Sequence, residues 1–257
     1  MSSSPATGRR LAVVTGAASG MGLATARQLA DGGTAVVGVD LDGEPDQLSG
    51  DTAAWVRGDI AEPSTWDRVA GVAAEIDPAG ADCLVCCAAA ITVKPFLDTR
   101  PEDFRRLFEI NVLGVIRGLR TLLPPMVALG RGAVAVVCSV DSLFAEEEMS
   151  AYAASKAALL QVVRSAALEH ARDGLQINAV LPGAVDTPLL RQHLAHSPDP
   201  ADALTQCERR SPQGRLLRPE EVARTLCFLV SPGASGLSGA AITVDGGLTS
   251  TYDFTGP

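Results

Sequence analysis

The sequence predicts an α/β protein in which seven parallel strands form one doubly wound sheet within a single domain, residues 1–257. Short apolar runs rich in Val, Ala and Ile alternate with longer helix-like segments along the whole chain. The first of these runs leads directly into a glycine-rich turn. With 257 residues, of which 47% are hydrophobic, one domain can bury both faces of such a sheet. We expect six to seven helices around it.

The first strand is Leu11–Thr15, and the turn Gly16-Ala-Ala-Ser-Gly20-Met-Gly22 follows it at once. A helix-like segment then continues to about Asp31. This order suits the pyrophosphate of a dinucleotide, because glycines let the backbone approach the phosphates and a helix N-terminus faces the anion. The fold predicted here is therefore of the Rossmann type.

The second strand, Ala35–Val39, ends at Asp40, about twenty residues past the turn. A carboxylate there accepts hydrogen bonds from ribose hydroxyls and repels a 2′-phosphate. The next residue, Leu41, is not basic. The sequence thus favours NAD over NADP, and the alternative is an ordinary solvated Asp at a strand end.

The middle of the chain continues the alternation of strands and helices. We expect strands at Ala53–Arg57 and Asp82–Cys87, separated by an amphipathic helix, Ser64–Ile76, with Ser64 as its N-cap. The Cys83-x-x-Cys86 pair lies inside an apolar run and has no second ligand pair, so buried, reduced thiols are favoured over a metal or redox site.

A long helical segment is expected over Pro101–Leu129, ended or kinked by Pro124-Pro125. It carries Asn111 within an apolar stripe. A buried amide is unfavourable unless it is paired, so Asn111 requires a partner or a bound water. The alternative interpretation is a purely structural Asn at a helix bend.

The chemistry is concentrated after the next strand, Gly132–Val137, which delivers Ser139 at its carboxyl end. If Ser150 starts a helix that runs to about Ala171, Tyr152 and Lys156 are i and i+4 on one face. A nearby ammonium lowers the pKa of a phenol, so Tyr152 would exchange a proton readily. The Ser139 hydroxyl would orient an alcohol or carbonyl oxygen.

Two polar segments flank this region. The acidic run Glu146–Glu148 is predicted to be a solvated loop rather than a cation site, and Leu143, Phe144 and Met149 are candidates for a substrate wall. After a strand at Leu175–Leu181, residues 187–211 are predicted to form a mobile lid over the substrate. The His193 and His196 pair in it lacks a third ligand, so no metal site is predicted.

The chain ends with a predicted helix, Pro219–Ser231, and a last strand, Ala240–Val244. A net charge of −9 and a pI of about 4.8 argue against a nucleic-acid partner. No uncharged apolar run approaches 18 residues, and no hydrophobic leader is present, so we expect no membrane contact. Six cysteines in apolar runs favour reduced thiols and a cytoplasmic location.

The motifs resemble those of the classical short-chain dehydrogenase/reductases over nearly the whole chain. Thr15, Gly16, Gly20 and Gly22 match the family's Thr-Gly-x-x-x-Gly-x-Gly turn, and Ser139, Tyr152 and Lys156 match its catalytic trio. The resemblance implies an NAD-dependent oxidoreductase that moves a hydride between the nicotinamide and a secondary alcohol or ketone. It implies that Tyr152 is the general acid/base, Lys156 lowers its pKa and binds the nicotinamide ribose, Ser139 orients the substrate oxygen and Asn111 positions a relay water.

The resemblance also implies a set of cofactor contacts, with Asp59 at the adenine, and Val185 and Thr187 at the carboxamide. The full set is Gly16, Ser19, Gly20, Met21, Gly22, Asp40, Leu41, Asp59, Ile60, Ala88, Tyr152, Lys156, Pro182, Gly183, Val185 and Thr187. One stretch departs from the family: Cys86-Cys87-Ala88-Ala89 replaces Asn-Asn-Ala-Gly. We expect this change to affect sheet stability and NAD affinity, and not the chemistry.

Two other classes of function stay open at this point: an NAD-binding sensor or scaffold without turnover, and an epimerase or dehydratase of the same fold.

The sequence also predicts an assembly, because the helices Pro101–Leu129 and Ala151–Ala171 carry more apolar surface than one sheet face can cover. The resemblance points the same way, towards a homotetramer or homodimer that Ala166→Glu or Ala167→Glu would weaken.

Overall fold

The computed structural model describes residues 10–48, 52–195 and 197–250. It contains one sheet of seven parallel strands in the order β3-β2-β1-β4-β5-β6-β7. The strands are β1 Leu11–Thr15, β2 Ala35–Asp40, β3 Ala54–Arg57, β4 Cys83–Cys86, β5 Gly132–Val137, β6 Leu175–Pro182 and β7 Ala241–Val244. This confirms the predicted fold class, with strand ends within a residue or so of those expected.

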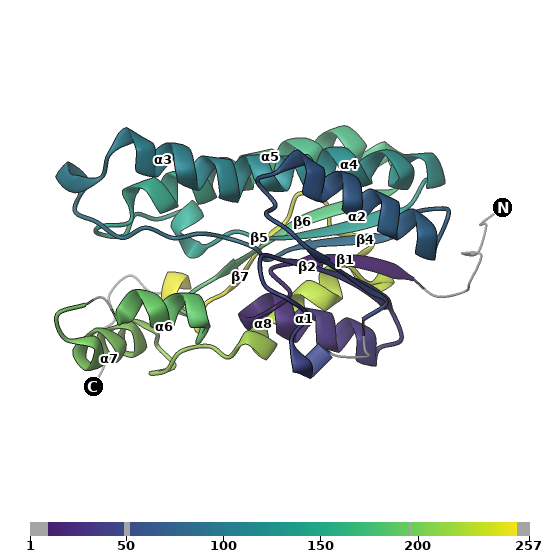
Figure 1. The fold of residues 1–257 in the computed structure, drawn as a ribbon. Coiled ribbons are helices and arrows are strands. Elements are labelled where there is room, and N and C mark those ends of the chain that lie inside the picture. The colour runs from purple at the N-terminus through teal and green to yellow at the C-terminus, as the bar shows by residue number, and fades with distance from the viewer. Residues whose placement is uncertain (1–9, 49–51, 196, 251–257) are drawn as a thin grey trace.

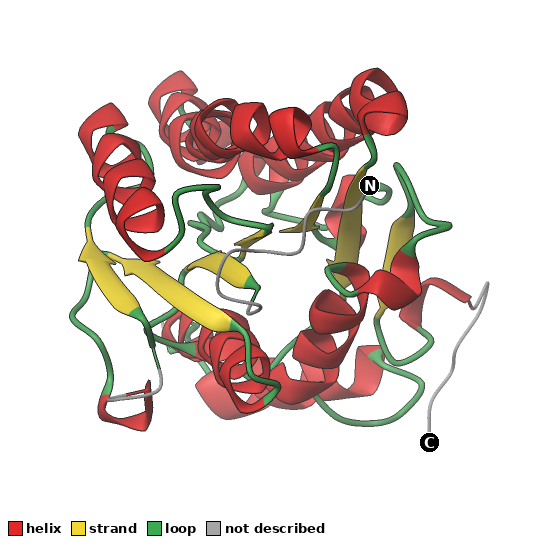
Figure 2. Cartoon of the chain, turned by 90° about the vertical axis from the view of Figure 1, so that its right-hand side faces the viewer, coloured by secondary structure: helices red, strands yellow, loops and turns green. Residues whose placement is uncertain are grey.

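Helices cover both faces of the sheet (Figure 1). They are α1 Gly20–Asp31, α2 Pro63–Ile76, α3 Pro101–Phe108, α4 Gly114–Leu129, α5 Ser150–His170, α6 Pro188–Leu194, α7 Pro200–Arg210 and α8 Pro219–Leu229. Helices α2, α4 and α5 lie on one face, and α1 and α8 on the other, as the turned view in Figure 2 also shows. The described residues thus hold eight helices rather than six or seven, because the long segment is divided and the predicted lid is helical.

The strands bury both of their faces, which explains why they read as continuous apolar runs. Successive side chains of a strand point to opposite faces. Leu11 and Val13 accordingly pack in the cluster that contains Trp66 of α2, whereas Ala12 and Val14 pack in the cluster under α1 and α8. Two separate cores therefore hold the sheet between its helical layers.

The predicted long helix is not continuous. A π-helical turn, Glu109–Leu113, separates α3 from α4 and carries Asn111. Pro124 and Pro125, which are expected from the sequence to end or kink the helix, do not end it; they lie inside α4, which runs on to Leu129 and stops at Gly130 with φ of 66°. The buried side chains around the prolines, such as Leu123 and Met126, hold this part of the helix against the sheet.

By length and composition alone, the combined stretch Pro101–Leu129 is apolar enough to cross a membrane, with a mean hydropathy of 1.4. Arg117 and Arg120 interrupt this stretch, so it contains no uncharged apolar run of about 18 residues. In the structure 44% of the apolar window is buried, since its inner face packs on the sheet. The position of a core helix accounts for this composition.

One predicted helix cap is wrong. Helix α2 begins at Pro63, and Glu62, in the cap position, makes no side-chain cap hydrogen bond. A proline suits the first helical position because its missing N–H would have no partner there. Ser150, in contrast, is the first residue of α5, as expected. Tyr152 and Lys156 therefore share one face of α5.

At the departure from the family pattern, Cys86-Cys87, a side chain of β1 links β1 to the end of β4. The Thr15 hydroxyl accepts hydrogen bonds from the backbone N–H groups of Cys87 at 3.2 Å and Ala88 at 3.3 Å. Thr15 itself is 1% exposed, so this link is buried on the side of β1.

Thr15→Val is therefore expected to lower the free energy of unfolding by about 1 kcal/mol, because the half-buried Ala88 N–H loses its acceptor while the side-chain shape is kept. The Cys87 N–H keeps the Thr15 carbonyl as an acceptor at 3.2 Å. Urea denaturation followed by circular dichroism measures the change. The control is Thr243→Val on β7, where the threonine is exposed. An equal effect of both substitutions would contradict the role assigned to Thr15.

Candidate active site

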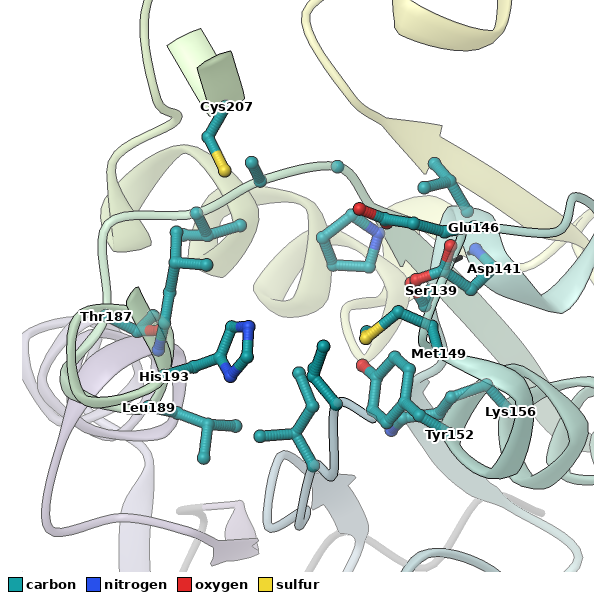
Figure 3. A pocket seen from close by; sticks show the side chains of 18 of the residues that line it. Ser139, Asp141, Glu146, Met149, Tyr152, Lys156, Thr187, Leu189, His193 and Cys207 are labelled. Atoms are coloured by element: carbon teal, nitrogen blue, oxygen red, sulfur yellow. Dashed lines mark hydrogen bonds between the residues drawn. The ribbon is translucent and has the colours of Figure 1, made fainter. Parts of the chain in front are cut away.

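The carboxyl ends of the strands meet at one edge of the sheet, and the strand order reverses between β1 and β4. A cavity of about 480 Å³ opens at this edge. Its walls come from the end of β5, the start of α5, the end of β6 and the two helices α6 and α7. Figure 3 shows Ser139, Tyr152 and Lys156 on one side of this cavity, and Thr187, Leu189 and His193 on the other.

The predicted trio is brought together by β5 and α5. Ser139, Tyr152 and Lys156 all line the cavity. Lys156 is 1% exposed, and its ammonium donates to the Val137 carbonyl at 2.8 Å while lying 5.7 Å from the centroid of the Tyr152 ring. The helix face that was predicted from the i, i+4 spacing thus points into the cavity.

Ser139 belongs to a hydrogen-bonded loop that sequence reasoning described only in part. Its hydroxyl donates to the Asp141 carboxylate at 2.9 Å and accepts from the Asp141 backbone N–H at 3.1 Å. The Ser142 hydroxyl donates to the Lys156 carbonyl at 3.0 Å, which fastens this loop to α5. Asp141 lines the cavity and was missed, because nothing in the local pattern distinguishes it from a solvated loop residue.

The electrostatics of Tyr152 differ from the prediction. Burial raises the pKa of its phenol, and the Asp141 carboxylate adds to this effect, while a hydrogen bond with Ser139 opposes it. Burial also lowers the pKa of Lys156. In this structure the pKa of Tyr152 is therefore raised rather than lowered, because desolvation outweighs the neighbouring ammonium.

Asn111 is fully buried beside the site. Its amide donates to the Ala90 carbonyl at 2.9 Å and to the Ser155 hydroxyl at 3.0 Å, and its oxygen accepts from the Ala90 N–H at 2.8 Å. It thus has the partners that the sequence required. The π-helical turn aims this side chain from the α3–α4 segment towards α5, and such turns are frequent at functional sites.

The glycine-rich turn has the shape that a pyrophosphate requires. Gly16 has φ of +70°, and a Cβ there would lie 2.8 Å from the Ala88 nitrogen; a Cβ on Gly22 would lie 2.0 Å from the Gly16 carbonyl oxygen. Ser19 precedes α1 and uses no side-chain oxygen to cap it. The residues of the turn therefore fit a dinucleotide, because backbone N–H groups and a helix N-terminus stand open at the strand end.

The adenosine end of the predicted site lies along β2 and β3. Asp40 accepts from the Ala18 N–H at 2.9 Å, which ties β2 to the glycine-rich turn, and Leu41 beside it is 60% exposed. Asp59 accepts from the Ala61 N–H at 2.8 Å. Ile60 is 5% exposed and packs near Gly114, so its side chain is not available to a ligand, and its carbonyl accepts from the Trp66 indole at 2.9 Å.

The nicotinamide end of the predicted site is part of the cavity. Its lining includes Met21, Pro182, Gly183, Val185 and Thr187. The Thr187 hydroxyl caps α6 by accepting from the Leu190 N–H at 3.3 Å. The predicted cofactor residues outside the cavity continue along the same edge of the sheet, since they follow β1, β2, β3 and β4.

The predicted substrate wall is only partly correct. Met149 lines the cavity, but Leu143 and Phe144 are 49% and 55% exposed and do not. Glu146 is not simply solvated either, because it forms an ion pair with Arg210 of α7. Helices α6 and α7 also supply Leu189, His193 and Cys207 to the cavity wall, whereas His196 lies outside the described residues. Among the residues that the structure describes, no His, Cys, Asp or Glu cluster is arranged to hold a metal.

The fold and the glycine-rich turn define a Rossmann-type, dinucleotide-binding α/β protein. Residues 16–249 match the family model described as enoyl-(acyl carrier protein) reductase. The chain is 40% identical to cis-4-hydroxycyclohexanecarboxylate dehydrogenase of Sinomonas cyclohexanicum over 93% of this chain and 96% of that protein. It is 34% identical to cyclopentanol dehydrogenase of a Comamonas species over 93% and 97%.

Among solved structures, the ligand-free aldohexose dehydrogenase of Thermoplasma acidophilum superimposes with a TM-score of 0.87 at 25% identity, covering 97% of both chains. The chain belongs to the short-chain dehydrogenase/reductase family. It is therefore an oxidoreductase of a family that uses nicotinamide cofactors.

Proposed function

We propose that this protein is an NAD-dependent dehydrogenase that transfers a hydride between the nicotinamide and a ring-bearing secondary alcohol or the corresponding ketone. The observation that supports it best is the meeting of Ser139, Tyr152 and Lys156 in one cavity that also contains the predicted nicotinamide end. A sensor without turnover would have no need of a proton donor and a buried ammonium placed together.

In this proposal the chain's own residues move the proton and hold the reactants. Tyr152 takes the proton from the substrate hydroxyl during oxidation and returns one to the ketone oxygen during reduction. Ser139 holds that oxygen, and Lys156 supplies positive charge beneath the Tyr152 ring and a donor to the ribose. The bound nicotinamide supplies the hydride chemistry. Asn111, which donates to the Ser155 hydroxyl of α5, positions a relay water.

The substrate class follows from the cavity and the relatives. Ile91, Val93, Met149 and Leu189 give the cavity apolar walls near Tyr152, which suit a small hydrocarbon ring. The named relatives act on a hydroxycyclohexanecarboxylate and on cyclopentanol. Glu146 forms an ion pair with Arg210, so a substrate carboxylate would have to compete with Glu146 for that guanidinium. A neutral ring alcohol is therefore the favoured substrate.

Tyr152→Phe is expected to reduce turnover at least about 10²-fold, because it removes the proton-transfer group. NAD affinity should change little, since the ring remains in the wall of the cavity. Reduction of NAD, followed at 340 nm with cyclohexanol, cyclopentanol and cis-4-hydroxycyclohexanecarboxylate, measures turnover, and a fluorescence titration measures NADH binding. Activity within a few-fold of wild type would remove Tyr152 from the mechanism.

The same assay separates the other functional classes. An NAD-binding sensor or scaffold would bind NADH and turn over none of the alcohols. An epimerase or dehydratase would convert its substrate without net reduction of NAD. Net NADH formation with a ring alcohol supports the proposed dehydrogenase.

We propose NAD rather than NADP because Asp40 stands at the end of β2 beside the exposed Leu41. Asp40→Ala with Leu41→Arg should raise the ratio of kcat/KM for NADP to that for NAD at least about tenfold, by removing a repulsion and adding a phosphate partner. Using the ratio cancels any general loss from the broken link to Ala18. Asp42→Ala is the matched control, and a native preference for NADP would overturn the assignment.

We further propose that residues 187–211, with α6 and α7, form the lid over the substrate, that the protein is cytoplasmic, and that it assembles as a homotetramer or homodimer. Support for the lid is its share of the cavity wall. The six cysteines are free thiols, as a reducing compartment requires.

An apolar groove between α4 and α5, lined by Leu123, Val127, Val162 and Ala166, supports the assembly. Ala167, which was expected to face the interface with Ala166, is 2% exposed and packs inside the chain, so a substitution there does not test the interface.

Ala166→Glu should weaken association at least about tenfold, because it puts a charge into an apolar contact. Light scattering across protein concentrations measures this. Ala74→Glu on the exposed face of α2 is the control, and a stable, active wild-type monomer would refute the assembly.

A further inference from the structure

We propose that Asp141 is a positioning residue that holds the Ser139 hydroxyl and keeps the proton on Tyr152, and thereby sets the pH range of alcohol oxidation. This inference rests on the proposed function. Asp141 is half-buried in the cavity wall between Ser139 and the Glu146 side chain (Figure 3).

The first step is the direction of the Ser139 proton. An ionised carboxylate has no proton to donate, so in the 2.9 Å contact the Ser139 hydroxyl is the donor and Asp141 the acceptor. The Asp141 N–H, 3.1 Å away, uses one of the two lone pairs of the same hydroxyl. Asp141 therefore competes with Tyr152 for the Ser139 proton, whose hydrogen bond would otherwise stabilise a Tyr152 phenolate.

The second step is charge. The Asp141 carboxylate opposes the formation of a second anion on Tyr152, which raises the pKa of that phenol in addition to the effect of burial. Competition for the Ser139 proton acts in the same direction. Oxidation needs Tyr152 in its deprotonated form, so both effects move the onset of oxidation to higher pH.

Other charged and titratable groups face Asp141 and Tyr152 from the surrounding elements, and none of them has the same effect on Tyr152 as Asp141. Glu146 raises the pKa of both Asp141 and Tyr152 but is paired with Arg210, which acts on Asp141 in the opposite sense. Lys156 is engaged by the Val137 carbonyl. The Cys138 thiol also raises the pKa of Tyr152, but burial raises its own pKa to about 11, so it stays neutral. His193 lines the far wall on α6.

Unlike Glu146, Asp141 has no cation within ion-pair distance among the residues that the structure describes. Its charge is therefore not neutralised locally. The pKa of the carboxyl itself is raised by burial, so the effect on Tyr152 disappears at a pH somewhat above the usual range for Asp.

The test is the pH dependence of kcat/KM for alcohol oxidation in wild type, Asp141→Asn and Asp141→Glu. Asp141→Asn keeps the side-chain shape and removes the charge, so the midpoint of the rise in kcat/KM should fall by about one pH unit or more. At a pH below the wild-type midpoint, a variant whose midpoint is about one pH unit lower should be faster than wild type by about tenfold. Asp141→Glu retains the charge and should keep the wild-type midpoint more closely.

The control is Glu147→Gln, which removes a carboxylate at the mouth of the same cavity that is not hydrogen-bonded to Ser139. Its profile should keep the wild-type midpoint. An unchanged midpoint in Asp141→Asn would overturn the role of Asp141. Equal shifts of the midpoint in Asp141→Asn and Glu147→Gln would also overturn it. A merely structural role would lower activity at every pH and would not make the variant faster at low pH.

A second measurement does not depend on turnover. The chain has two tyrosines, Tyr152 and Tyr252, so tyrosinate absorbance near 295 nm minus that of Tyr152→Phe reports Tyr152 alone. At the highest pH at which circular dichroism shows both proteins folded, Asp141→Asn should carry more Tyr152 phenolate than wild type. Equal absorbance overturns the inference. The absence of turnover by wild type with every alcohol would instead overturn the proposed function, so the two failures are distinguishable.

Discussion

The site depends on one buried ammonium. Lys156 sits at 1% exposure and donates to the carbonyl at the end of β5, while its own backbone carbonyl accepts from Ser142 in the following loop. Burying a charge is unfavourable unless it is well paired, so this arrangement persists only if β5, the loop and α5 stay in fixed contact. Strand, loop and helix therefore behave as one unit, and Ser139 and Tyr152 are held on it.

The surrounding sheet fixes where that unit points. With all strands parallel, their carboxyl ends meet at one edge. The glycine-rich turn after β1 and the loop after β5 are thus brought to the same edge although they are far apart in sequence. Ser139, Tyr152 and Lys156 and the expected cofactor residues therefore share one edge because of topology.

Some of this could be predicted from sequence because it is local. The i, i+4 spacing of Tyr152 and Lys156 places them on one face of a helix that starts at Ser150, and Gly16 and Gly22 are explained by backbone shape alone. The Glu146–Arg210 ion pair was not predictable, because its two residues come from a loop and a helix that are far apart in the sequence. Asp141 was missed although Ser139 is only two residues away, because no sequence pattern shows that the turn brings its carboxylate onto that hydroxyl. The phenol pKa was misjudged for the same reason: an ammonium one helical turn away is visible in a pattern, whereas desolvation by the whole cavity is not. Ala167 was misplaced because an alanine-rich helix shows no clear apolar face.

Helices α6 and α7 add no strand to the sheet, yet they form the wall opposite Tyr152. Exchanges of side chains in this segment can alter the size and polarity of the cavity without disturbing either hydrophobic core. The cavity wall and the two hydrophobic cores therefore use different parts of one chain. The shape of the site can change through substitutions in a short stretch, while the unit of β5 and α5 that holds Tyr152 and Lys156 stays the same.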